Sequence, residues 1–190
     1  MPGTYATLWI EEYAQSELIS SLHYISIAIG ATLCGQIGGL AMDKLYQLLS
    51  KRAGGKAAAE YRIPYMVPGM LIMPVGLVWY GWSAERKLHW AMVDVGVVVF
   101  TLGSFMINQA TVAYQIEEFG QFAASAGAAS RSVSYGVACV FPIFAPGLFE
   151  NLGYGWGNST LAFVAMGLGL TTCAVLWFWG ARIRAIGRPA

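Results

Sequence analysis

Arg131 is the residue whose position most strongly suggests chemistry, because it lies inside a long apolar block. An arginine at the centre of a membrane helix costs about 2.5 to 3.5 kcal/mol on insertion scales, so it should face protein or a water-filled cavity. Gly127 and Tyr135, four residues to either side, would share its helix face. Two interpretations stay open: a structural ion pair with Glu117 or Glu118, or a position on the path of a transported solute.

The apolar block before Arg131 carries a second set of polar side chains, namely Asn108, Gln109 and Thr111. Such groups need hydrogen-bond partners in a low-dielectric setting. They either bond between helices or form, with Arg131, a polar strip along one cavity that Tyr114 would extend. We predict Asn108, Gln109, Tyr114 and Arg131 as the candidate substrate path.

A Gly-x-x-x-Asp-basic sequence, formed by Gly39, Asp43 and Lys44, ends the first apolar block. An acid at a helix end beside a basic residue could join neighbouring helices through charge-assisted hydrogen bonds that break when the protein changes state. The alternative is a solvated helix end. Gly35 and Gly39, four residues apart, also predict a close approach between helices.

The residues that usually carry enzyme or metal chemistry are scattered along this chain. His23 and His89 stand alone, and the three cysteines, Cys34, Cys139 and Cys173, lie in three different apolar blocks. This spacing argues against a zinc site, a disulfide framework and a clustered active site. We therefore expect no enzymatic activity, no cofactor or metal, and no nucleic-acid ligand.

Long apolar segments must position these side chains. The chain is 57% hydrophobic and 11% charged, with a mean hydropathy of +0.56, whereas soluble domains are about a quarter charged. A bilayer core needs about 20 apolar residues in a helix, and continuous apolar runs do not fit the alternating strands of a membrane barrel. The sequence predicts an all-α membrane protein with five transmembrane helices. Their ranges are 22–42, 65–83, 90–114, 123–149 and 160–180.

Asp94 is the one acid near the start of the third predicted span, where it can reach water. A role in proton coupling is the less favoured interpretation of this residue, because an interfacial carboxylate can be solvated without any such role.

Basic residues predict the orientation. Cytoplasmic connections of membrane proteins are enriched in Lys and Arg, and five spans place the first loop and the C-terminal tail on one side. That side carries Lys44, Lys51, Arg52, Lys56, Arg62, Arg182, Arg184 and Arg188, whereas the other carries Arg86 and Lys87. We predict a cytoplasmic tail over residues 181–190. Residues 1–21 are then extracellular, as the end of a truncated preceding helix.

Five stretches of the sequence carry a likeness to a known family: Tyr61–Gly69, Gly76–Ala84, Phe122–Ala126, Phe141–Pro146 and Leu152–Ser159. They resemble fungal major facilitator superfamily transporters of the drug:proton antiporter group. The likeness covers nearly the whole chain and begins at the end of what would be that family's seventh span.

The resemblance implies a twelve-helix fold in which this chain supplies spans 8 to 12 of the C-terminal half, around a cavity with alternating access. Gly39, Asp43 and Lys44 match the family's gating motif between spans eight and nine, and Arg131 matches an arginine of the eleventh span. The implied substrates are drugs, toxins or fungal secondary metabolites. The implied location is the fungal plasma membrane.

The chain departs from the family pattern at two places. Glu117, Glu118 and Phe119 stand where the family usually has an Asp, a small residue and a Tyr, and Asp94 stands where Asn is usual. The first half is absent, and with it the carboxylates that such antiporters are expected to use for proton coupling.

The resulting prediction is an efflux transporter polypeptide present as a C-terminal half. A lone half could not provide alternating access, which requires one bundle to rock against another. We therefore expect a lipid bilayer, a small organic substrate, protons and a separate N-terminal half as partners. The alternative is a truncated, non-transporting membrane protein or assembly partner.

Overall fold

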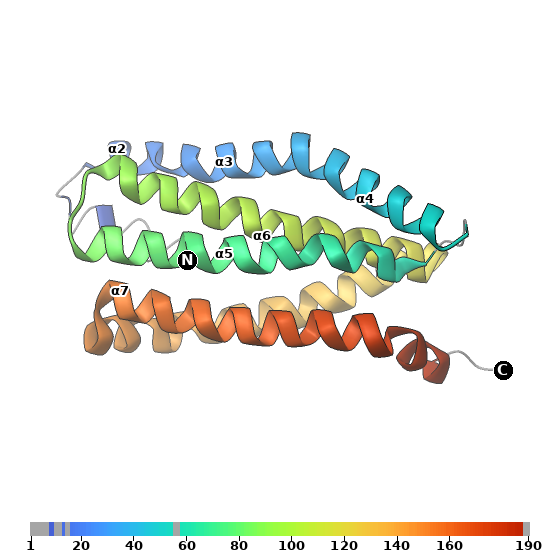
Figure 1. The fold of residues 1–190 in the computed structure, drawn as a ribbon. Coiled ribbons are helices and arrows are strands. Elements are labelled where there is room, and N and C mark those ends of the chain that lie inside the picture. Colours follow the sequence, from blue (N-terminus) through green and yellow to red (C-terminus); the bar gives the residue numbers. More distant parts are fainter. Residues whose placement is uncertain (1–7, 10–12, 14–15, 55–57, 188–190) are drawn as a thin grey trace.

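The computed structural model describes residues 8–9, 13, 16–54 and 58–187, and their regular structure is helical throughout, with no strand. The helices run side by side along one long axis (Figure 1). Their bounds are α2 Glu17–Leu22, α3 Tyr24–Leu33, a π turn Cys34–Gly38, α4 Gly39–Arg52, a 3-10 turn Ala59–Arg62, α5 Ile63–Glu85, α6 Trp90–Phe119, a 3-10 turn Gly120–Phe122 and α7 Ala123–Gly187.

The first long rod consists of α2, α3, the π turn and α4, which follow one another in Figure 1. It begins where the Ser16 hydroxyl accepts a hydrogen bond from the backbone N–H of Ile19, as helix N-caps commonly do. It ends after Arg52, followed by Gly54 in a left-handed conformation, at φ 73°. The predicted span 22–42 lies entirely inside this rod.

Two glycines turn the chain in its C-terminal part. Gly120, with φ 49°, separates α6 from α7, and Gly153, with φ 72° and ψ 174°, breaks α7 internally. L-residues with a side chain rarely adopt these conformations. In Figure 1 the early part of α7 (beige) runs away from the end of α6, and its later part (orange) returns. α7 therefore consists of two antiparallel helices.

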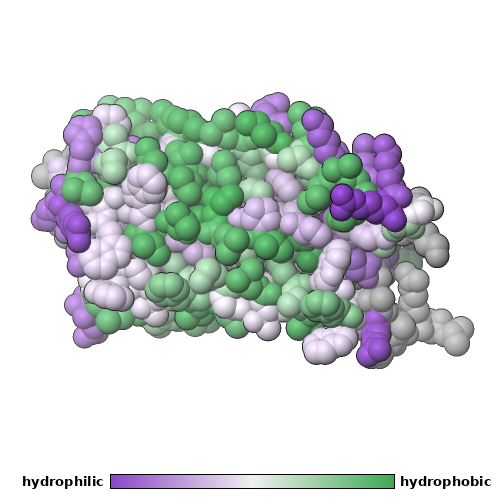
Figure 2. Space-filling view, in the orientation of Figure 1, coloured by the Kyte–Doolittle hydropathy of each residue, from purple (hydrophilic) through white to green (hydrophobic). Residues whose placement is uncertain are grey.

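Four helical stretches are long and apolar enough to cross a membrane: Glu17–Arg52, Ala59–Glu85, Trp90–Val140 and Ile143–Gly180. The surface in Figure 2 shows a green apolar belt between two purple polar ends. The predicted all-α membrane class is thus confirmed. The third stretch includes the turn at Gly120 and the fourth includes the break at Gly153. Crossing the membrane five times stays a prediction.

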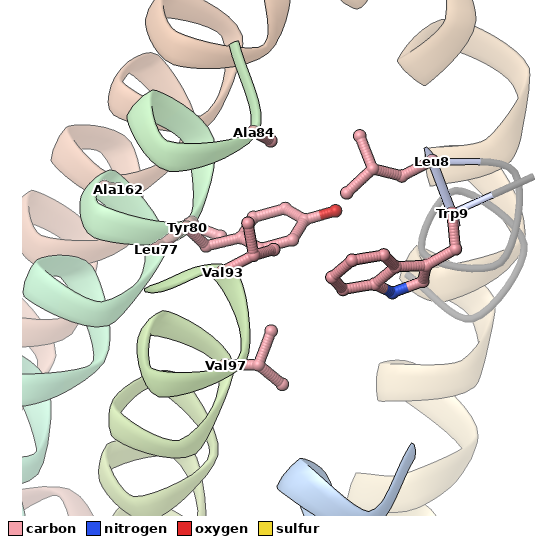
Figure 3. Packing of buried hydrophobic residues seen from close by; sticks show 8 residues of the cluster. All are labelled: Leu8, Trp9, Leu77, Tyr80, Ala84, Val93, Val97 and Ala162. Carbon is pink, nitrogen blue, oxygen red and sulfur yellow. The ribbon is translucent and has the colours of Figure 1, made fainter. Parts of the chain in front are cut away.

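α5 lies at the centre of the bundle, between α6 and α7. One apolar cluster fills the end near Glu85, where Leu8 and Trp9 point toward Tyr80 and Val93 (Figure 3). A second cluster, around Ile63, fills the other end. Most of the N-terminal segment predicted over residues 1–21 lies outside the described residues. α7 continues to Gly187, through most of the tail predicted over 181–190.

Glycines allow α5 and α6 to approach closely. A methyl group at Gly76 would overlap the backbone of Phe100, and one at Gly103 would overlap the backbone of Met73. The close approach predicted at Gly35 and Gly39 is not found among the described residues, because a methyl at either position meets no described atom within 4 Å. Helices that are apolar all round give no sequence signal for the contacting face.

Glu85 stabilises the break in α7 at Gly153. Its carboxylate, at the end of α5, accepts the backbone N–H of Gly155, just after Gly153. A carboxylate beside the first turn of a helix satisfies a free N–H and interacts favourably with the helix dipole. We expect Glu85→Ala to lower the free energy of unfolding by about 1 kcal/mol, the usual effect of losing an N-terminal cap. Thermal unfolding in detergent measures this. An unchanged midpoint, relative to an Arg86→Ala control, would contradict the capping role.

Candidate functional site

Arg62 is the centre of a charged cluster that joins three helical segments at one end of the bundle. Its Nη1 lies 2.8 Å from Oδ1 of Asp43 on α4, and its Nη2 lies 2.7 Å from Oε1 of Glu117 on α6. Its Nε donates to the same Glu117 oxygen at 2.9 Å. The guanidinium also lies over the ring of Tyr46, 4.3 Å from the centroid. We call Asp43, Tyr46, Arg62 and Glu117 the Arg62 cluster.

The side chains of the cluster differ strongly in their exposed fractions. The Arg62 side chain is 13% exposed and that of Glu117 is 25% exposed, whereas that of Asp43 is 60% exposed. Asp43 can therefore regain water if its bond to Arg62 opens, but Arg62 cannot do so without moving. An ion pair of this kind can separate at low energetic cost on its exposed side.

The structure connects only one of the three predicted gating residues to this cluster. Asp43 forms the interhelical charge-assisted bond that the sequence suggested, and its partner is Arg62. Lys44 is exposed and forms none of the ion pairs recorded among the described residues. Gly39 lies one turn before Asp43, on the same rod.

Sequence reasoning missed Arg62, Glu117 and Tyr46 as members of the site. Arg62 counted only toward orientation, yet a short connection after α4 must return the chain to the start of α5. That return brings Arg62 within reach of Asp43, 19 residues earlier. The suggested pairing of Arg131 with Glu117 is not what the structure shows, because Glu117 bonds Arg62.

Gln109 bonds across to the first rod. The Cys34 thiol donates to its Oε1 at 3.4 Å, at the start of the π turn. π turns inside helices often mark functional positions. Gly38, in the same turn, leaves room for the Tyr65 hydroxyl and the Gln109 side chain. Gln109 thus takes part in an interhelical contact inside the bundle.

The other predicted path residues meet different neighbours. Asn108, next to Gln109, is exposed on the surface of α6. Tyr114 is half-buried and packs against the cluster around Ile63 and Cys173, on the α5 and α7 side. Thr111 donates to the carbonyl of Ile107 in its own helix. The structure does not gather Asn108, Gln109 and Tyr114 into one group.

Arg131 lines an open groove between the end of α6 and the start of α7, with a volume of about 440 Å³. Gly127 and Gln115 line the same groove. Gly127 was predicted to share a helix face with Arg131, and its place in the groove agrees with that prediction. The Gln115 amide donates to Ser130 at 2.9 Å and so ties the two helices together beside the groove. Residues 131–140 are exposed throughout, so this face of α7 has no cover from the described part of the chain.

Fungal transporters match this chain over almost its full length. An uncharacterized transporter of Schizosaccharomyces pombe is 40% identical over 96% of the chain and 37% of its own length. "Probable efflux pump mfs2" of Aspergillus flavus is 40% identical over 96% of the chain and 43% of its own length. "MFS transporter cpaT" of Aspergillus oryzae is 38% identical over 93% and 35%. No family model and no solved structure matches.

The apolar helical stretches indicate a multi-pass membrane protein, and the relatives that it matches are fungal transporters. In sequence, the chain resembles part of fungal transporters of the major facilitator superfamily. It spans about two fifths of the length of the curated relatives it matches. The predicted resemblance to this family is confirmed.

Proposed function

We propose that this chain acts as the C-terminal half of an exporter of small organic molecules, crossing the bilayer five times with its C-terminus in the cytoplasm of a fungal cell. The single observation that supports this most strongly is the match to a named efflux pump over 96% of the chain but 43% of that protein. The two turns, at Gly120 and Gly153, divide the described helices into the antiparallel rods that five passes need.

The exposed face of α7 supports a second bundle as partner. Residues 131–140 are exposed, and Arg131 lines a groove that opens on this side. Charged groups inside a membrane protein face other protein or a water-filled cavity. An N-terminal half packed here would enclose Arg131 and Asn108 in a central cavity, with Gln109 and Tyr114 in the wall behind them.

The Arg62 cluster is then a gate at the cytoplasmic end. Alternating access requires contacts that form in one state and break in the other. The bond between Arg62 and the exposed Asp43 is the weakest of the cluster, since Asp43 regains water on opening. Gly39 and Lys44, on the same helix, would move with Asp43. Coupling to protons would depend on carboxylates of both halves.

Efflux from yeast cells tests this proposal. The chain is expressed alone, and also together with the N-terminal portion of the Aspergillus flavus relative, in cells loaded with the fluorescent lipophilic cation rhodamine 6G. We expect faster dye loss only with both parts present, because one bundle cannot rock by itself. Arg131→Ala should remove the gain, and Arg52→Ala is the matched surface control. If a panel of neutral, anionic and cationic dyes shows no gain under either condition, the chain does not transport.

A further inference from the structure

His23 and Asp94 form an ion-pairing contact inside the bundle that the Arg62 cluster and the groove at Arg131 do not involve. The His23 Nδ1 lies 2.7 Å from Oδ2 of Asp94, joining the junction of α2 and α3 to the first turns of α6. Their side chains are only 8% and 17% exposed. Neither residue was expected to have the other as partner, since they are 71 positions apart.

Aromatic rings hold the imidazole in place. The Trp9 ring stacks on His23 with 3.6 Å between centroids and 4° between planes, and Trp9 is fully buried. Trp90 approaches the same imidazole edge-on at 6.1 Å. The Ser26 hydroxyl donates to the backbone carbonyl of His23 at 2.6 Å. The ring orientation is therefore fixed by stacking and by the bond to Asp94.

A groove of about 560 Å³ gives access to this pair. It lies between the α2–α3 rod and α6, and its walls are mainly apolar residues such as Ile29 and Val98. His23 and Asp94 are the two titratable residues among those that line it. The groove is at the end of the bundle opposite the Arg62 cluster, which the proposed orientation makes the extracellular end.

The charge state of the carboxylate, rather than the 2.7 Å distance, decides where the ring hydrogen lies. An ionised carboxylate can only accept, so the imidazole Nδ1 must carry the hydrogen that points at Asp94. The Nε2 is then the ring atom that gains or loses a proton. Uptake of one proton at Nε2 gives an imidazolium facing a carboxylate, in which both partners of the bond are charged. Uptake of a second proton, by the carboxylate, removes that attraction.

We propose that His23 and Asp94 form a proton-binding site, reached through this groove, in which proton uptake sets the strength of the contact between α3 and α6. This inference goes beyond the proposed function and requires no transport to be tested. In an exporter, the site would make the extracellular side of this half responsive to external pH.

Other titratable groups surround the site at greater remove. Tyr13 packs at a tilt against Trp9, with 4.9 Å between ring centroids and 46° between ring planes, and its hydroxyl donates to the backbone carbonyl of Leu88. His89 lies beside Trp90, with centroids 5.1 Å apart. Glu17 begins α2, six residues before His23. His89 is the competing histidine, and it must be told apart from His23 in any titration.

The two histidines differ in a way that an experiment can read. In the proposed arrangement His23 donates through Nδ1 to Asp94, whereas the Nδ1 of His89 accepts the backbone N–H of Ala91 at 3.4 Å. They are the only histidines of the chain. Ring-¹⁵N-labelled histidine in the purified protein in bicelles therefore yields two sets of signals, and His89→Gln assigns them. Neutral His23 should carry its hydrogen on Nδ1, and neutral His89 on Nε2.

The proton-binding claim is tested by taking the folded protein from about pH 8 to about pH 5 and asking whether Nε2 of His23 gains a proton over this range. We expect one proton fewer per chain taken up by His23→Gln, and loss of the Nδ1-bonded signal in Asp94→Leu. A pH-dependent change in fluorescence that disappears in Trp9→Phe is the second measurement. A His23 ring that keeps one charge state throughout this range, or that carries no hydrogen on Nδ1 when neutral, would overturn the proposal. Neither result depends on rhodamine efflux, so the two proposals can fail separately.

Discussion

Arg62→Met is expected to lower the free energy of unfolding by about 1.5 to 3 kcal/mol, the range for hydrogen bonds to charged groups. The substitution removes the bonds to Asp43 and Glu117 together with the stacking on Tyr46. It also leaves two carboxylates facing each other at the same end of the bundle. Methionine keeps much of the side-chain volume, so the decrease in unfolding free energy measures the contribution of the guanidinium group.

The effects of substituting the two carboxylates that bond this arginine should follow the burial of each carboxylate. Asp43→Asn should cost less than about 1 kcal/mol, because an exposed ion pair contributes little. Glu117→Gln should fall between the two, since Glu117 accepts two of the bonds. Unfolding by SDS titration in mixed micelles gives the order, with Arg52→Met as an exposed basic control. Equal effects of Arg62→Met and Arg52→Met would show that the cluster does not hold α4, α5 and α6 together.

Gly76→Ala should be the most damaging small substitution in the chain, with a loss of about 3 kcal/mol or more. The added methyl would overlap the Phe100 backbone, and helix backbone cannot move aside as a flexible side chain can. The two helices would have to separate along their whole interface. Gly103→Ala should act in the same way, against the backbone of Met73.

Gly167→Ala is the matched control for this prediction. A methyl at Gly167 meets no atom within 4 Å, and alanine favours helices over glycine by about 1 kcal/mol. The control should therefore be neutral or stabilising. The yield of folded monomer after gel filtration and the midpoint of thermal unfolding measure both variants. A Gly76→Ala protein as stable as Gly167→Ala would contradict the close packing of α5 on α6.

The helices themselves could be predicted from the sequence because the bilayer imposes a length and an apolar character on them. The predicted segments 22–42, 65–83 and 90–114 each lie within one helical rod of the structure. The helices extend further than predicted, since Glu17 and Arg52 bound the first rod. Polar residues continue a helix beyond the apolar run, and apolarity alone does not mark that boundary.

Contacts between helices were much harder to predict. The acid in the pattern of Gly39, Asp43 and Lys44 indicates a charge-assisted hydrogen bond. Its partner, Arg62, depends on how the helices pack, and the sequence pattern does not show this. The pairing of His23 with Asp94 depends in the same way on the rotation of each helix about its axis. When a helix is apolar on every side, no periodicity shows which face is buried. The roles of Asn108, Gln109, Tyr114 and Arg131 in a substrate path remain predictions.

The side of the membrane on which each connection lies tests the five-pass arrangement most directly. Cys34, Cys139 and Cys173 are first replaced by alanine. Single cysteines are then introduced, one per protein, by Gly54→Cys, Lys87→Cys and Arg182→Cys. Intact yeast cells that express each protein are treated with a membrane-impermeant maleimide. We predict that Lys87→Cys is labelled in intact cells, whereas Gly54→Cys and Arg182→Cys react only after lysis. The five-pass arrangement requires an even number of crossings between residues 54 and 182, so labelling of Gly54→Cys and Arg182→Cys from opposite sides would contradict it.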